Sequence, residues 1–470
     1  MSHVSPPDRS LGGSGGAPSG EVVALSPSGA RVWKVGSLQY TAGGLVVLFL
    51  LLLLGDFSWS MRDRSVGPMA QWYLKHLDVP NYLFALLISS FPALVGLVLG
   101  PIISVKSDRH RGPRGRRIPF LLVTTPIAAA GMIGLGVTPH LARWVHGHFP
   151  GQSEVFVAVV CFGVFWAIFE FATIAAMAIF GGLINDVVPQ EFLGRFYGLF
   201  RAVSLIDGMI FNFWILGKVE TYYTVILVII GFFYGLSFYW VCLKVREGDY
   251  PPPETHANTH PLAEVKTYFR ECFHRPYYVG VFVMMMAASL VFMPVNIFMI
   301  PYADSLGMSM DTYGKCLALT FLISLILAYP LGWLADVFHP LRMCIFSLVG
   351  YAVVTGWGAL NARTPETFAI ALVLHGVLSG CYFTVGASLG ARLFPRTRYA
   401  QFASASGIVG SLGAMTVGPL VGGLVDATGN AYYHTFTAGC VMAVIALLAA
   451  IGVYLRFLSL GGPRGYVAPE

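Results

Sequence analysis

Three acidic side chains and one arginine interrupt the long apolar runs of this sequence, and they are the residues best placed to do chemistry. They are Asp56, Glu170, Arg201 and Asp207. A charge near the centre of a lipid bilayer costs about 2.5–3.5 kcal/mol on insertion scales, so an ionisable residue there is a candidate for function. One titratable carboxylate is enough to carry a proton, and carboxylates also accept hydrogen bonds from hydroxyl groups. The alternative for each acid is a structural ion pair with an arginine of a neighbouring helix, and Arg201 suits that role for Asp56 or Glu170.

The run Arg62-Asp63-Arg64 has two interpretations, which depend on where the first membrane helix ends. Residues 40–60 alone are long enough to cross a bilayer, and the three charges would then form an external collar. If the helix instead runs from about residue 45 to residue 73, they enter the interior. Arg62 then becomes a candidate ligand-binding residue, and Asp63 a further candidate proton carrier.

The second half of the chain has fewer polar groups inside its apolar runs. Asn296 and His375 are the main ones. A single histidine in a membrane segment is more often hydrogen-bonded packing than a proton relay, so both readings of His375 stay open.

Composition places the chain in a membrane. Of its 470 residues, 56% are hydrophobic and only 11% are charged, against about 25% in soluble domains. The net charge of +6 comes from basic residues in the gaps between apolar runs, so we expect no nucleic-acid partner. The seven cysteines are scattered singly and make no C-x-x-C pair, so we expect no disulfide framework, no metal site and no cofactor.

Twelve apolar runs are long enough to cross a bilayer as helices, the only open-ended elements that satisfy their own backbone in lipid. They cover residues 40–60, 82–104, 118–139, 155–183, 196–216, 222–245, 277–302, 313–334, 343–361, 368–389, 402–425 and 436–458. Basic residues concentrate in the connections after the even-numbered runs, most strongly between Lys106 and Arg117. This bias places those connections in the cytoplasm, and with twelve helices it predicts that both termini are cytoplasmic too.

The longest break between runs divides the helices six and six, which is the paired-half architecture of secondary transporters. We expect a disordered cytoplasmic tail over residues 1–33 and a first six-helix bundle over 34–245. A cytoplasmic loop with an amphipathic segment follows over 246–275, then a second bundle over 276–458 and a tail over 459–470. The stretch Ser104-x-x-Ser107-Asp108 recurs as Gly332-x-x-Ala335-Asp336 at the corresponding place of the second half.

One stretch resembles a known family. The run S-D-R-H-R-G-P-R-G-R-R-I-P-F over residues 107–120 is similar to the loop between helices two and three of sugar–cation symporters in the major facilitator superfamily. That group includes the glycoside–pentoside–hexuronide and the sucrose–proton symporters. Supporting matches are Gly55-Asp56-Phe57, Asp186-x-x-Pro189 and Glu247-Gly248-x-Tyr250. The resemblance covers residues 40–458 and implies the twelve-helix, all-α major facilitator fold.

The resemblance also implies roles for individual residues. An acid in helix four beside an aromatic ring contacts the sugar in this family, and Glu170 with Trp166 matches that pattern. In helix one, Trp59 follows Asp56 by three residues. The expected substrate-binding residues are Asp56, Trp59, Arg62, Trp166, Glu170, Arg201, Asn296 and His375. The expected proton-coupling residues are Asp56, Asp63, Glu170 and Asp207. The expected cytoplasmic gate, which latches the halves by charge pairing, comprises Asp108, Arg109, Arg116, Arg117 and Asp336.

Sodium coupling of the melibiose-carrier type is not expected, because this chain has Gly96 and Gly100 where those relatives carry the acids that bind sodium. We therefore predict a monomeric transporter of the plasma (inner) membrane that moves a glycoside or disaccharide with protons by alternating access, its partners being sugar, proton and lipid bilayer. The alternatives are a carrier of a lipid or other amphiphile, or a sodium-coupled sugar symporter. An enzyme is not expected, since the sequence has no H-E-x-x-H or G-x-S-x-G motif.

Overall fold

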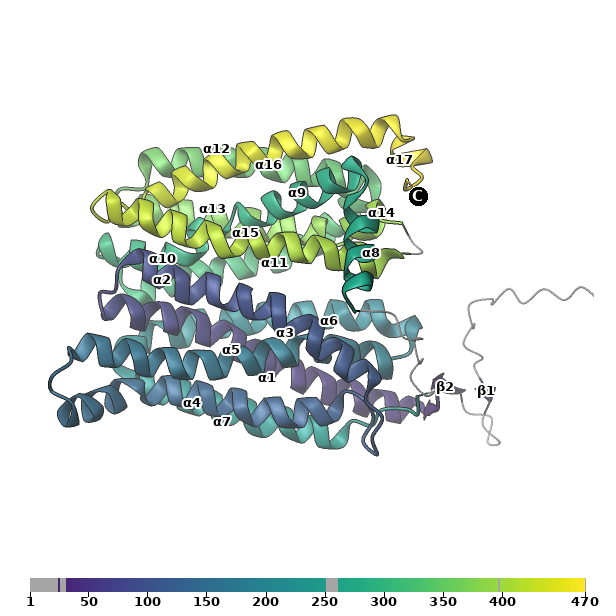
Figure 1. Cartoon of the computed structure of the whole chain (residues 1–470), viewed down its shortest axis with the longest axis horizontal. Helices are drawn as coiled ribbons and strands as arrows, with labels where there is room; N and C mark the ends of the chain where they lie inside the picture. Colours follow the sequence, from purple (N-terminus) through teal and green to yellow (C-terminus); the bar gives the residue numbers. More distant parts are fainter. Residues whose placement is uncertain (1–23, 26–30, 251–260, 396–397, 470) are drawn as a thin grey trace, which may run out of the picture.

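The computed structural model describes residues 24–25, 31–250, 261–395 and 398–469. Most of them form long helices that lie side by side (Figure 1). The helices are α1 (Ala42–His76), α2 (Asn81–Ala85), η1 (Leu86–Ser90), α3 (Phe91–Arg109), α4 (Ile118–His148), α5 (Glu154–Val187), α6 (Gln190–Ile210), η2 (Phe211–Ile215), η3 (Leu216–Lys218), α7 (Val219–Lys244), α8 (Pro261–Phe273), α9 (Pro276–Leu290), α10 (Met293–Ser305), α11 (Met310–Phe338), α12 (Pro340–Asn361), α13 (Pro365–Gly386), α14 (Leu389–Leu393), α15 (Tyr399–Ala427), α16 (His434–Ser459) and α17 (Gly462–Gly465).

The helices begin at residues that favour a helix start. The hydroxyls of Thr41, Ser153 and Ser309 accept hydrogen bonds from the backbone of the first turns of α1, α5 and α11. Thr364 forms a reciprocal cap with Thr367 at the start of α13. These caps satisfy backbone N–H groups that have no partner inside the helix.

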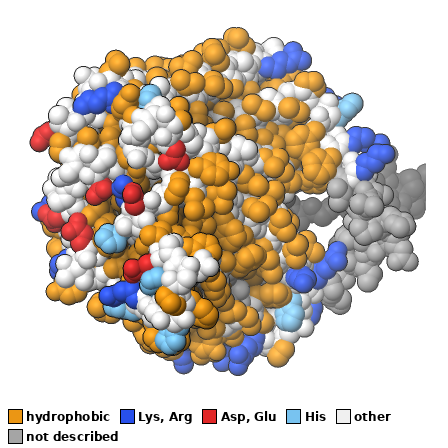
Figure 2. Space-filling view, turned by 60° about the vertical axis from the view of Figure 1, so that its left-hand side comes forward, with side chains coloured by type: hydrophobic (Ala, Val, Ile, Leu, Met, Phe, Trp, Pro, Cys, Tyr) orange, Lys and Arg blue, Asp and Glu red, His pale blue; other side chains and the backbone are white. Residues whose placement is uncertain are grey.

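Eleven helical stretches among the described residues are long and apolar enough to cross a membrane. One of them, Gln190–Lys244, has 55 residues, whereas a single crossing needs about 20. It contains α6 and α7 with the 3₁₀ turn η3 between them, so it provides two crossings and brings the total to the expected twelve. Figure 2 shows the corresponding broad hydrophobic band on one face, with charged side chains gathered at the ends. The chain is an all-α integral membrane protein.

The helices fall into two halves that follow the sequence. Figure 1 places α1–α7 in one half and α9–α16 in the other. Within the first half, α4 packs against α5 and α7, and α1 packs against α6 and α7. Within the second, α12 packs against α13 and α16, and α11 against α13. The halves meet where α11 contacts α6 and where α15 contacts α2 and α3.

We name the two ends of the molecule by their residues. The arginine-rich end holds the connection between α3 and α4, together with α8 and the C-terminus. The opposite end holds the connections between α1 and α2, α10 and α11, and α15 and α16. Every long helix runs from one of these ends to the other.

The N-terminal region differs from the expected disordered tail where the structure describes it. Strand β1 (Ala24–Leu25) pairs with β2 (Arg31–Val35), which pairs with β3 (Leu38–Tyr40). The ring of Trp33 packs edge-on against Phe192 of α6, with ring centroids 5.9 Å apart. Residues 1–23 and 26–30 of the expected tail lie outside the described residues.

The first membrane helix follows the longer of its two possible courses. α1 has 35 residues and continues past the Arg62-Asp63-Arg64 run to His76. These three charges therefore lie in the middle of a helix and do not form an external collar.

Candidate functional site

A cavity of about 470 Å³ lies between the two halves, near the middle of the helices. This volume falls in the range of about 300–1,000 Å³ typical of small-molecule sites. Helices α1 and α6 and segment η2 supply its lining from the first half, and α10, α11 and α13 supply it from the second. The polar side chains in that lining are Asp63, Arg64, Gln71, Arg201, Asn212, Asn296, Thr320, Ser324, His375 and Ser379.

Four of the residues expected from the sequence meet in this cavity. Asp63 and Arg201 line it from the first half, and Asn296 and His375 line it from the second. The side chain of Asp63 is 54% exposed within the structure. The cavity can therefore offer a carboxylate, a guanidinium and an amide to one solute.

Two carboxylates lie buried behind the cavity, on α1 and α6. Asp207 is fully buried, and Asp56 lies close enough for the two charges to interact. Neither oxygen of Asp207 has a hydrogen-bond partner among the described residues, and the same holds for Oδ2 of Asp56. Burying ionised carboxylates without partners is costly, so the pair is stable when it shares a proton or takes up a cation. Arg64 is the cation that interacts with Asp207.

Arg62 is held away from the cavity by aromatic rings. Its side chain is only 2% exposed, and its guanidinium lies 4.0 Å from the centre of the Trp59 ring and 5.0 Å from that of Tyr234. Nη2 donates to Asp63 Oδ1 at 2.5 Å. Cation–π contacts and this ion pair stabilise a buried charge that lipid could not. Arg62 therefore orients Asp63, and in this conformation it does not line the cavity.

The two tryptophans expected to stack on a sugar are packed inside the first half. Trp59 stacks on Phe180, and Trp166 donates from Nε1 to the carbonyl of Leu87 at 2.9 Å. Leu87 belongs to the π-helical segment η1, so this bond satisfies a carbonyl where the regular helical ladder is interrupted. Neither ring lines the cavity.

Glu170 lies between the packed interior and the charges of α1. It is half-buried on α5, and Arg62 and Asp63 both interact with its carboxylate electrostatically. Glu170 is not part of the cavity lining in this conformation.

His375 connects two helices of the second half. It is buried, with Nδ1 2.8 Å from the Tyr351 hydroxyl and Nε2 3.0 Å from Asn296 Oδ1. A neutral ring protonated on Nε2 satisfies both contacts, because it donates to Asn296 and accepts from Tyr351. His375 therefore fixes the orientation of the Asn296 amide at the cavity wall.

The halves are joined from the middle of the molecule to the opposite end. Asp426 of α15 accepts from the backbone N–H groups of Asn81 and Tyr82 at 2.9 and 2.8 Å, which caps the start of α2. Asn81 also donates to Asn430, and Tyr432 donates to Asn81. Between described residues, no hydrogen bond or ion pair joins the halves at the arginine-rich end.

The arginine-rich loop forms an ion-pair cluster inside the first half. Arg116 donates from Nε and Nη2 to Asp186, and Arg117 binds Asp186 at 2.5 Å and Asp108 at 3.1 Å. Arg109 is exposed. In the second half, Asp336 pairs with Arg392 at 2.9 Å. Four of the five expected gate residues, Asp108, Arg116, Arg117 and Asp336, are thus paired within their own halves in this conformation.

Glu247 holds this loop against the start of α4. Its carboxylate accepts from the backbone N–H groups of Arg116, Arg117 and Ile118 at 3.0, 2.8 and 2.6 Å. The hydroxyl of Tyr250 donates to the same carboxylate, and burial together with the charge of Glu247 raises the pKa of Tyr250. Gly115 has φ +91°, and a Cβ there would collide with the Glu247 side chain.

Several functional candidates escaped the sequence reasoning. Gln71 lines the cavity, yet only its position on the same helix as Asp63 would have singled it out. Arg64 and Asn212 also line the cavity, and the sequence indicated them only as polar residues of helices one and five, with no role of their own. Glu247 belongs to a stretch that supported the family resemblance, but its neighbours in the sequence gave no sign that it caps the start of α4. The Asp426 cap joins residues more than 300 positions apart, and such a pairing has no local signal.

Residues 281–465 match the family model described as Major Facilitator Superfamily. Comparison with curated protein sequences finds no match.

Solved structures with similar folds cover most of the chain. A bacterial homologue of the human lysosomal transporter Spinster, in an inward-facing and occupied conformation, has a TM-score of 0.65 and 14% identity over 90% of this chain and 98% of its own. The nucleoside transporter NupG has a TM-score of 0.60 and 12% identity over 88% and 98%. A D-xylose–proton symporter has a TM-score of 0.58 and 15% identity over 85% and 96%. At these identities the likeness shows the fold alone, which is the major facilitator fold expected from the sequence.

Replacing Glu247 by alanine should destabilise the first half. The change leaves three backbone N–H groups without their charged acceptor, and we expect a loss of about 2–3 kcal/mol in the free energy of unfolding. Thermal unfolding in detergent measures this as a lower midpoint. The control is Glu191→Ala, an exposed acid in the first turn of α6. Equal midpoints for the two variants would contradict the role given to Glu247.

Proposed function

We propose that this protein is a secondary active transporter that moves a sugar, a glycoside or disaccharide, together with protons by alternating access. The observation that carries the proposal is the cavity between the two halves, lined by charged and amide side chains from both. A solute bound there touches both halves, so a rocking motion of one against the other would change the end from which it is reached.

The polar lining suits a ligand with many hydroxyl groups. Asp63 offers acceptors, Arg201 offers donors, and the Asn296 amide offers both. The rings of Phe321 and Phe383 also line the cavity and can cover the apolar face of a sugar ring. One of the structural relatives is a D-xylose–proton symporter, which agrees with this choice of solute.

The buried pair Asp56 and Asp207 is proposed to carry the proton. Neither oxygen of Asp207 nor Oδ2 of Asp56 has a hydrogen-bond partner among the described residues, and Arg64, which interacts with Asp207, also lines the cavity. Arg64 donates to Ser204 and lies over the Phe321 ring of the other half at 4.7 Å. A movement of the halves would shift Arg64 relative to the acid pair and so change the stability of its ionised form. Glu170 and Asp63 remain further candidates for this role.

The arginine-rich end is proposed to face the cytoplasm, because basic residues prefer that side. Both termini would then be cytoplasmic. In the plasma membrane the closed opposite end would face outward, and the monomer would be in an inward-facing conformation. Opening to the outside would require breaking the Asp426 cap of α2. The expected gate residues would pair across the halves only in that outward-facing state.

Two alternatives predict different behaviour. A carrier of lipids or other amphiphiles would need an apolar cavity. The acid, arginines and amides that line this cavity argue against such a carrier. A sodium-coupled symporter would place the cation at the buried acid pair, since hard cations prefer oxygen ligands. Uptake by reconstituted vesicles separates these possibilities, with an imposed pH or sodium gradient and a panel of labelled sugars.

Replacing Asp207 by asparagine should uncouple sugar from protons. The amide cannot bind and release a proton, so we expect accumulation driven by a pH gradient to fall at least about tenfold. Exchange of labelled for unlabelled sugar at equal concentrations needs no net proton movement and should continue. Asp249→Asn, an exposed acid beyond α7, is the control. Gradient-driven accumulation at the normal level in Asp207→Asn would exclude this residue as the proton carrier.

Replacing Arg201 by glutamine should weaken sugar binding. A hydrogen bond from a charged donor is worth about 1.5–3 kcal/mol, so we expect the KM for uptake to rise about 10- to 100-fold. The matched control is Arg195→Gln, at an exposed position of the same helix that does not line the cavity. An unchanged KM in Arg201→Gln, or an equal rise in both variants, would place the sugar elsewhere.

A further inference from the structure

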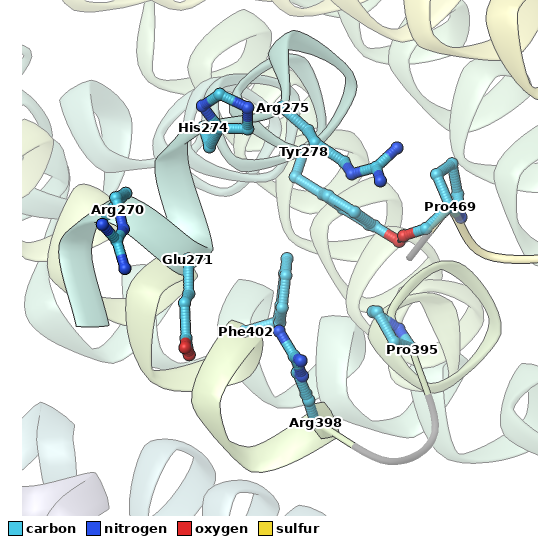
Figure 3. A pocket seen from close by; sticks show the side chains of 9 residues that line it. All are labelled: Arg270, Glu271, His274, Arg275, Tyr278, Pro395, Arg398, Phe402 and Pro469. Carbon is cyan, nitrogen blue, oxygen red and sulfur yellow. The ribbon is translucent and has the colours of Figure 1, made fainter. Parts of the chain in front are cut away.

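A second hollow lies at the arginine-rich end of the second half, away from the cavity. It has a volume of about 390 Å³ and lies between α8, α9, the start of α15 and the end of the chain. Figure 3 shows its lining, in which Arg270, Arg275 and Arg398 border the open space with His274. Glu271, the one acid among the described residues of this lining, accepts a hydrogen bond from Gln401 at 2.9 Å. The hollow therefore has an excess of positive charge.

An apolar groove adjoins this hollow. It has a volume of about 640 Å³, lies between α9 and α16, and shares Arg275 and Pro469 with the first hollow. Gly280 of α9 and Gly452 of α16 lie in its lining, and a Cβ at Gly452 would meet nothing within 4 Å. The rest of the lining is mainly aliphatic, and Arg456 is its other charged residue.

The chain end joins the two hollows. The hydroxyl of Tyr278 donates to the carbonyl of Pro469 at 2.7 Å, which holds this residue beside Arg275. A cationic hollow thus opens directly onto an apolar groove on the outside of two membrane helices. This is the combination of surfaces that a molecule with an anionic head and a hydrocarbon chain would need.

We propose that these two hollows bind one anionic phospholipid of the surrounding leaflet. Arg275 and Arg398 bind the phosphate head, and an acyl chain lies in the groove between α9 and α16. Each basic residue near an anionic lipid surface contributes enough to change affinity about fivefold. The acyl chain adds hydrophobic burial that a water-soluble anion cannot supply.

Lipid at this site would link α8 and α15 to α9. The polypeptide of α9 continues into α10, which carries Asn296 at the cavity, and the far end of α15 carries Asp426. The site therefore lies on helices that also form the cavity wall and the closed end.

Native mass spectrometry of the purified full-length protein tests the proposal. The protein is mixed with dioleoyl phosphatidylglycerol or dioleoyl phosphatidylcholine, and bound lipid is counted for each. We expect a preference for phosphatidylglycerol that falls about 25-fold in the double variant Arg275→Ala/Arg398→Ala. Arg195→Ala, which removes an exposed charge from the same end of the other half, should keep the preference.

Two further measurements distinguish a lipid from a free anion. Gly452→Leu fills the groove and leaves the arginines in place, so it should reduce phosphatidylglycerol binding. Thermal unfolding of this variant is the control that it is folded. Inorganic phosphate should compete only weakly with the lipid. Full competition by phosphate together with normal lipid binding in Gly452→Leu would overturn the proposal in favour of a free-anion site. Equal binding of the two lipids, or an equal loss in Arg195→Ala, would overturn it as well.

Discussion

The charges of α1 impose the main physical constraint on this structure, because none of them can be left in contact with lipid. Arg62, Asp63 and Arg64 share one turn of this membrane helix, and Asp56 lies between one and two turns before Arg62. The aromatic rings and Asp63 stabilise the charge of Arg62. Ser204 and the Phe321 ring stabilise that of Arg64, and Asp63 is itself exposed to the cavity. Asp56 is left beside Asp207 without a full set of partners.

This arrangement explains why one side of α1 faces the second half. Its charges need polar surroundings that the first half alone does not provide, and the cavity between the halves supplies them. The Phe321 ring under Arg64 and the Asn296 carbonyl that accepts from Gln71 both come from the second half. A change in the position of the halves must therefore change the environment of the α1 charges, and the proposed coupling of proton binding to solute movement would rest on this change.

The fold followed from the sequence because apolar runs and basic loops are local patterns. Run lengths predicted the helices, including both crossings within Gln190–Lys244, where the 3₁₀ turn η3 lies between α6 and α7. The site was predictable in part. Asp63, Arg201, Asn296 and His375 were expected and do line the cavity. Contact with lipid is costly for a polar side chain, so such a residue within an apolar run faces the interior of the helix bundle.

What the sequence could not show was the direction in which each side chain points. Trp59 and Trp166 have the residue type for stacking on a sugar, but they pack against Phe180 and the Leu87 carbonyl, since their helix faces turn inward. The run Arg62-Asp63-Arg64 spreads over three directions within one turn of helix, so Arg62 is buried while its neighbours reach the cavity. Contacts such as Asp426 to Asn81 depend on how the halves are closed, which no local pattern encodes.

The central claim is that solute and proton move together through the cavity. The most direct measurement follows the pH outside lightly buffered vesicles that contain the protein while a sugar is added without any imposed gradient. If solute and proton move together, the medium becomes more alkaline as the sugar enters, and this change disappears when a protonophore collapses the pH difference. Sugar uptake without any change in external pH would contradict this claim.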